Sequence, residues 1–129
     1  MTDYRELGRR LIGEMNPRLA GVPTRDTGFA NELRELSIDI AFGQVWSRPA
    51  LSRRDRSLVT LGILIALRAE SELEHHFPIA VGNGVSIEEL EELIYHSAIY
   101  AGFPSAHVAQ LVGRRTLPAT VEDTTQAST

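Results

Sequence analysis

The spacing of hydrophobic residues along this chain is that of amphipathic helices. Leu7, Leu11 and Ile12 form an apolar stripe that predicts a first helix over residues 3–14. Asparagine, glycine and proline then predict a loop over residues 16–27. The chain therefore opens with one short amphipathic helix and a connection.

Two helices are predicted in the middle of the chain. The first covers residues 31–46 and ends before Pro49. Ser52 is placed to cap the second, over residues 53–67, which is apolar on nearly every side. A helix of that kind is expected at the centre of a fold, covered on all sides.

Three more helices follow toward the C-terminus. Ser71 predicts the cap of a helix that ends at residues 82–84, where two glycines allow a helix C-cap. Ser86 and Glu89 have capping-box spacing and predict a helix that reaches Gly102. After Pro104 comes a last helix toward residue 115, for which Ser105 is the predicted cap.

No hairpin signal occurs anywhere in the sequence, so the predicted fold is all-α with about six helices. We expect one helical domain over residues 1–115. Residues 116–129 are rich in threonine, alanine and serine and lack an apolar stripe, which predicts a disordered tail.

Composition excludes several classes of function. A net charge of −4 argues against a nucleic-acid-binding surface, which needs a basic excess. The chain has no cysteine, which excludes disulfides, thiolate metal sites and cysteine nucleophiles. Because the N-terminus is polar, we expect no signal peptide, and the apolar run over residues 58–67 is shorter than the roughly 20 residues that span a bilayer. We therefore expect a cytoplasmic protein with no membrane partner.

Two adjacent histidines are the first candidates for chemistry. Glu72 lies four residues before His76, so on a helix the two share a face. The carboxylate either orients the imidazole for proton transfer or forms an ordinary exposed ion pair. His75 and His76 point about 100° apart on a helix and cannot easily chelate one ion, so we expect no metal site.

Arginines gather where the apolar helix begins. Arg48 and Arg56 either keep this region soluble or bind a substrate carboxylate, and Arg56 directly opens the apolar run. Trp46 is expected to anchor the core or an interface. The sequence has no nucleophile elbow, phosphate-binding loop or dinucleotide fingerprint.

Three stretches of the sequence are distinctive together. They contain Trp46-Ser47-Arg48-Pro49, Glu70-Ser71-Glu72-Leu73-Glu74-His75-His76 and Ala101-Gly102-Phe103-Pro104. With their flanks they cover residues 29–115 in order, and in this combination the chain resembles the carboxymuconolactone decarboxylase family. The resemblance implies an alkylhydroperoxidase-like helical fold and a homo-oligomeric ring, a trimer or a hexamer.

The resemblance also implies a chemistry. Wider relatives reduce peroxides with a Cys-x-x-Cys pair before a histidine that His76 matches, but Ala69 and Glu72 replace those cysteines, which excludes thiol chemistry. The family implies instead a carboxy-lyase without cofactor, which removes CO2 from 4-carboxymuconolactone, a small-molecule carboxylate of aromatic catabolism. His76 is then expected to deliver the proton, Glu72 to orient it, and Glu70 to serve as a second carboxylate.

The substrate is expected to contact four further residues. Arg48 or Arg56 would hold its anionic groups, and Trp46 and His75 would line its pocket. His75 stands where the catabolic enzyme is expected to have an apolar residue, and Pro78 follows closely. If Pro78 lies in a first turn, the helix begins later and the Glu72–His76 face is lost.

These departures keep two alternatives open. One is a related proton-transfer enzyme of secondary metabolism, an isomerase or a cyclase. The other is a non-catalytic assembly protein that binds a ligand.

Overall fold

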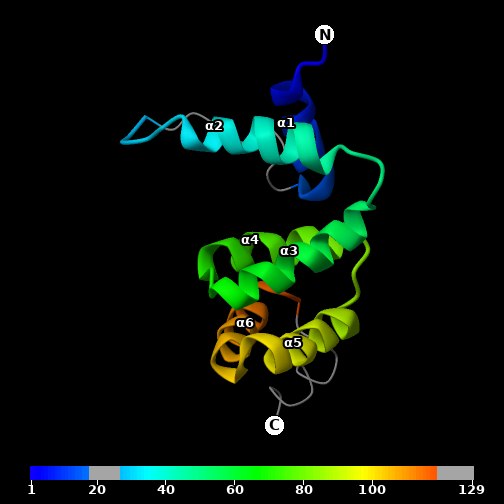
Figure 1. Ribbon diagram of the computed structural model, residues 1–129, viewed down its shortest axis with the longest axis vertical. Helices are drawn as coiled ribbons and strands as arrows, with labels where there is room; N and C mark the ends of the chain where they lie inside the picture. The colour runs from blue at the N-terminus through cyan, green and yellow to red at the C-terminus, as the bar shows by residue number, and fades with distance from the viewer. Residues whose placement is uncertain (18–26, 119–129) are drawn as a thin grey trace. The chain divides into compact units, whose positions relative to one another are not determined.

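The computed structural model describes residues 1–17 and 27–118, and within them every regular element is a helix (Figure 1). The all-α prediction with about six helices is confirmed for this part of the chain. The elements are α1 (Tyr4–Met15), α2 (Leu33–Ser37), the π-helix η2 (Ile38–Trp46), α3 (Arg53–Leu67), α4 (Glu70–Gly82), α5 (Ile87–Ala101) and α6 (Phe103–Thr116). Most of the predicted loop and of the predicted tail lies outside the described residues.

The contacts divide the chain into two compact units, Met1–Arg56 and Ser57–Thr129. The positions of these units relative to one another are not determined, so each is described by itself. The single domain expected from the sequence over residues 1–115 stays a prediction.

The first unit is built on the contact between α1 and η2. Gly8 and Gly43 lie where the two helices meet. A Cβ atom on Gly8 would collide with the carbonyl of Ile38, and one on Gly43 would collide with the carbonyl of Tyr4. The two glycines thus let the helix backbones approach more closely than side chains allow.

The helix predicted over residues 31–46 is present but changes type along its length. It begins as α2 and continues as the π-helix η2. Within η2 the side-chain amide of Gln44 donates a hydrogen bond to the side-chain carboxylate of Asp39 at 2.8 Å. Two β-branched residues, Ile38 and Ile40, weaken the α-helical preference of this segment. π-Helical turns are rare and are found frequently at functional sites.

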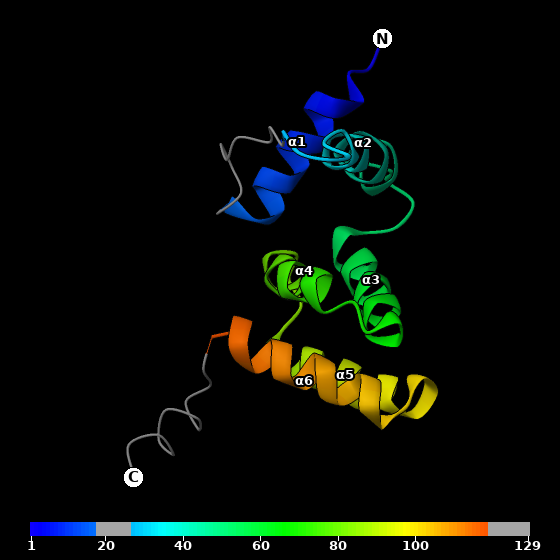
Figure 2. The same ribbon diagram turned by 90° about the vertical axis from the view of Figure 1, so that its left-hand side faces the viewer.

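The second unit has one hydrophobic core, to which all four of its helices contribute. α6 packs against both α4 and α5, as Figure 2 shows. The fully buried side chains are Leu61, Ile65, Leu73, Phe77, Ala80, Val85, Leu90, Ala109 and Val112. This core fixes α4, the helix that carries both predicted histidines.

The expectation that the apolar helix α3 is covered on every side is wrong. Leu61 and Ile65 are buried, but Val59, Ile63 and Leu67 are largely exposed. Residues spaced by four share a helix face, so α3 buries one stripe and leaves another in solvent. No helix of the described residues is long and apolar enough to cross a membrane.

Two of the predicted helix caps are confirmed. The backbone N–H of Asp55 donates to the Ser52 hydroxyl at 3.0 Å. This hydrogen bond satisfies one of the first N–H groups of α3, which have no carbonyl partner within the helix. Ser86 and Glu89 form both hydrogen bonds of a capping box at the start of α5. These signals are local, since each cap and its partner lie within one turn.

The caps predicted at Ser71 and Ser105 are wrong. α4 begins after Ala69, which makes no side-chain cap hydrogen bond. α6 begins directly after Gly102, and Ser105 is buried inside it. The Ser105 hydroxyl accepts a hydrogen bond from the Nε atom of Arg68 at 3.0 Å, so it holds the end of α3 instead of capping a helix.

Candidate active site

Helix α4 runs without interruption from Glu70 to Gly82 and contains Pro78. Proline removes one backbone donor, so the carbonyl of Glu74 has no helical N–H from residue 78. The helix nevertheless begins well before Phe77, and Glu72 and His76 lie one turn apart on one face. The alternative in which these two residues do not share a face is therefore wrong.

His76 is half-buried, and its Nδ1 atom is buried. Burial lowers the pKa of His76 below its ordinary value of 6.5, because the protein interior disfavours the charged imidazolium. The negative charge of Glu72 opposes this effect and raises the pKa, while His75 lowers it further. Burial prevails, so His76 is neutral at neutral pH, and its protonated form is a stronger acid than a free imidazolium.

His75 occupies a different environment one position earlier. It is exposed, and its Nδ1 atom lies 2.7 Å from the carbonyl oxygen of Ser71. Because a carbonyl oxygen only accepts, Nδ1 carries the hydrogen and donates it. In neutral His75 the outward Nε2 atom is therefore an acceptor.

Glu70 is held by α6. Its carboxylate lies 3.2 Å from the guanidinium of Arg115, which also approaches Glu74 at 3.9 Å. All three side chains are about half exposed, so this ion-pair group is worth little stability by itself. It does fix the direction of the Glu70 carboxylate at the start of α4.

A polar pair that the sequence did not single out extends the face of α4 that carries His76. Asn83 lies seven residues after His76, two turns along the same face. Its side-chain amide donates a hydrogen bond to the Ser57 hydroxyl at 2.9 Å, and Ser57 is fully buried on α3. The sequence did contain one signal for this pair. Ser57 directly precedes an apolar run, and a hydroxyl buried there needs a hydrogen-bond partner.

The three other predicted residues belong to the first unit. The ring of Trp46 stacks on Phe42 with centroids 5.8 Å apart. Arg56 donates hydrogen bonds to the backbone carbonyls of Arg48 and Leu51, both at 3.2 Å. The Arg48 side chain itself is exposed. The structure thus uses Arg56 to hold the loop that presents Arg48.

The predicted residues therefore form two groups. Glu70, Glu72, His75 and His76 lie together on the first turns of α4, whereas Trp46, Arg48 and Arg56 surround the end of η2. Within residues 1–17 and 27–118, no three histidine, aspartate or glutamate side chains converge as metal ligands do.

The sequence model of the carboxymuconolactone decarboxylase family matches residues 31–113, from the start of α2 to the last turn of α6. The chain belongs to this family. The resemblance found in the sequence motifs is thereby confirmed, and the α4 group and the η2 group both lie inside the matched segment.

Two characterised relatives are similar to the chain. A protein of Acinetobacter baylyi named 4-carboxymuconolactone decarboxylase is 44% identical over 81 residues, which are 63% of this chain and 60% of the relative. A protein of Metarhizium robertsii named nitrosuccinic acid decarboxylase is 42% identical over 91 residues, which are 70% of this chain and 64% of the relative. The chain thus matches less than two thirds of the length of each relative.

Proposed function

We propose that this chain is a carboxy-lyase that works without a cofactor on 4-carboxymuconolactone or a similar carboxylated lactone or carbonyl compound. The observation that carries the proposal is the half-buried His76, one turn after Glu72 on α4. Membership of the family supports it, as do the names of both relatives, which describe decarboxylases.

The reaction divides into bond cleavage and proton delivery. The bond between the carboxylate and the ring carbon breaks, CO2 leaves, and the electron pair moves into the conjugated lactone carbonyl. The resulting enolate then takes a proton at carbon, which protonated His76 supplies. Solvent restores the proton on His76, and no oxidant or metal enters the balance.

The surroundings of His76 suit this role. A lowered pKa makes the imidazolium a stronger acid, which favours transfer to a weakly basic carbon. The negative charge of Glu72 opposes this effect by raising the pKa of His76, and in the proposal its carboxylate orients the ring. Glu70 is the second carboxylate of the proposal, and it forms an exposed ion pair with Arg115 at 3.2 Å.

Arg48 and His75 are the proposed ligands of the substrate's anionic and polar groups. Arg48 is an exposed guanidinium on a loop that Arg56 holds through two carbonyls, so it is free to form a bidentate pair with a carboxylate. We assign Arg56 to the support of this loop and Trp46 to an apolar wall beside it.

The second relative widens the substrate class. Its name specifies a nitro-substituted diacid, and a nitro group accepts electrons as a lactone carbonyl does. An acid with an electron-accepting group near its carboxylate therefore describes both possibilities. A related proton-transfer reaction and ligand binding without turnover are the other outcomes of the test below. We further propose that the chain is a homo-oligomer, a trimer or a hexamer, as the family resemblance implies.

The deciding experiment is CO2 release by the purified chain from 4-carboxymuconolactone and, in parallel, from nitrosuccinic acid. His76→Ala is expected to lower turnover by a factor of about 100 or more, the usual contribution of a positioned proton donor. His107→Ala is the matched control, because this exposed histidine on α6 lies outside the proposed site.

The possible outcomes distinguish the role of His76 from the decarboxylase activity itself. Loss of turnover in His76→Ala but not in His107→Ala supports the assignment. Equal loss in both variants, or none in His76→Ala, contradicts the role of His76 while leaving the activity. No release by the wild-type chain from either acid contradicts the decarboxylase itself and favours ligand binding.

A further inference from the structure

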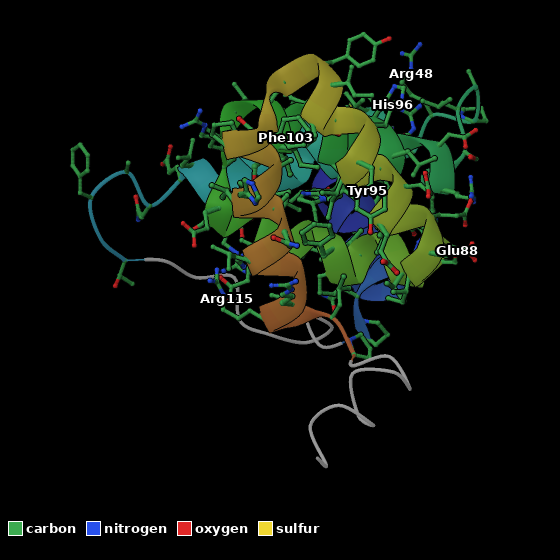
Figure 3. All side chains as sticks on the ribbon, turned by 90° about the horizontal axis from the view of Figure 1, so that it is seen from below. Arg48, Glu88, Tyr95, His96, Phe103 and Arg115 are labelled. Carbon is green, nitrogen blue, oxygen red and sulfur yellow. The ribbon has the colours of Figure 1, made fainter. Side chains whose placement is uncertain are left out.

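Helices α5 and α6 present an outward face that the core of the second unit does not use. The exposed fractions are 75% for Ile99, 82% for Tyr100 and 66% for Phe103. The rings of His96 and Tyr100 lie 5.1 Å apart and extend the same surface. Figure 3 shows this face, with Glu88 on its α5 side and Arg115 on its α6 side, and with Tyr95 and Phe103 nearer to the turn between the helices.

An exposed apolar surface of this kind favours binding to another protein surface. Burial of large apolar side chains in a contact removes them from water, which favours association. Monomeric proteins rarely keep contiguous patches of this type exposed, and the aromatic side chains here are those enriched at protein interfaces.

Charges of opposite sign border the two sides of the face, away from the turn between the helices: the start of α5 is the acidic end, and the last turn of α6 is the basic end. Glu88, Glu91 and Glu92 follow the start of α5 and make no ion pair within the described residues. The hydroxyl of Tyr95 donates to Glu91 at 3.3 Å, and the negative charge of Glu91 raises the pKa of Tyr95. The acidic end is therefore a concentrated and uncompensated negative surface.

The basic end lies on α6. Arg114 and Arg115 stand in its last turn. Arg115 is paired with Glu70 and Glu74, whereas Arg114 is exposed and makes no ion pair in the described part of the chain. One cation thus remains available at the end of α6.

The two helices meet at Gly102, which has a φ of +97° and lets the chain turn directly from α5 into α6. Glu91 and Arg114 are nearly equally far from this corner along the chain, and Ile99 and Phe103 flank it closely. In a contact between two copies whose twofold axis passes through this corner, α5 of one copy would lie on α6 of the other. Acidic residues would then face basic ones, and apolar residues would face apolar ones. The face is therefore complementary to itself, as a twofold contact requires.

We propose that the outward face of α5 and α6 binds the same face of a second copy of this chain, with Glu91 of one copy opposite Arg114 of the other. The inference rests on the proposed self-assembly and names one of its surfaces. Of the two proposed assemblies it requires the hexamer, because a closed trimer has no twofold axis. It is independent of the proposed reaction, because its readout is the mass of the assembly.

The test is a charge exchange in the full chain, read by sedimentation velocity over a range of concentrations. Glu91→Arg and Arg114→Glu each place like charges together twice in the contact, and each is expected to weaken association by at least an order of magnitude. The double variant restores opposite charges and is expected to return association close to that of the wild type. Glu32→Arg, an exposed charge reversal on the first unit, is the control and should change nothing.

A second variant tests the apolar part of the same contact. Ile99→Arg is expected to abolish association through this face, and circular dichroism checks that the chain still folds. A double charge variant that associates no better than the single variants contradicts the pairing. If the wild-type chain assembles and none of these variants changes the mass of the assembly, the proposed surface is wrong but the self-assembly is not. If the wild-type chain is a monomer, both are wrong.

Discussion

Glu72 lies one helical turn before His76 on α4, and its negative charge raises the pKa of a histidine whose pKa burial lowers. Burial is the larger effect. The pair therefore does not behave as an exposed ion pair, in which the histidine would gain a proton more readily than in solution. Of the two readings that the spacing left open, the half-buried position of His76 favours the proton-transfer pair.

Removing the charge of Glu72 should lower the pKa of His76 further. In Glu72→Gln only the effects that lower this pKa remain, so the imidazole should titrate at a more acidic pH. The titration is measured from the ring proton shifts of His76 in NMR spectra. If His76 is the proton donor, the fall in kcat/KM on the alkaline side moves to lower pH by the same amount.

Glu74→Gln is the matched control for this prediction. Glu74 is two residues away on the same helix but approaches Arg115, and it is not among the groups that shift the pKa of His76. An equal shift in both variants would mean that the general negative charge of α4, and not Glu72, acts on His76.

His76 should also make stability depend on pH. Its folded-state pKa is below the unfolded value of 6.5, so between these two values the unfolded chain binds more protons than the folded chain. The free energy of unfolding should therefore fall as the pH falls through 6.5, and the contribution of His76 should level off below its folded pKa. Denaturant titrations from pH 8 to pH 4.5 measure this, and His76→Gln should flatten the dependence. A dependence unchanged in His76→Gln would assign it to other groups.

The sequence predicted best what depends on neighbours along the chain. Ser52 and Ser86 were identified as caps because each meets a backbone N–H three residues later. The Glu72–His76 face followed in the same way from helical spacing, once α4 was continuous. Family membership came from motifs that are local in sequence.

What the sequence did not predict depends on contacts between distant segments. Serine is a residue type that often caps helices, but the hydroxyl of Ser105 accepts a hydrogen bond from Arg68, which lies far from it in sequence. The Ser57–Asn83 pair joins α3 to α4 and has no signature in either segment alone. The burial that lowers the pKa of His76 likewise comes from packing, which periodicity does not specify.

The Ser57–Asn83 hydrogen bond should contribute measurably to stability. Ser57→Ala removes the hydroxyl to which the amide of Asn83 donates, and the loss of such a hydrogen bond typically costs about 1–3 kcal/mol of the free energy of unfolding. A double-mutant cycle with Asn83→Ala, followed by denaturant unfolding, isolates the pair, because the two losses should not add. Ser37→Ala is the control, since that exposed hydroxyl only contacts the carbonyl of Arg34 in its own helix. Strictly additive effects of Ser57→Ala and Asn83→Ala would show that the hydrogen bond does not contribute to the free energy of unfolding.

Glycine-to-alanine substitutions should have opposite effects in the two units. Gly8→Ala and Gly43→Ala each put a methyl group into the backbone of the other helix, and backbone cannot move aside as a flexible side chain can. We expect each to destabilise the first unit by about 1–3 kcal/mol or more, the usual cost of overpacking. Gly62→Ala on α3 meets no atom within 4 Å and should instead stabilise by about 0.5–1 kcal/mol, because alanine favours the helix. Hydrogen exchange of the amides in α1 and η2 measures the first effect, and that of the amides in α3 the second. Protection in α1 that survives Gly8→Ala would mean that the two helices do not need the close approach seen here.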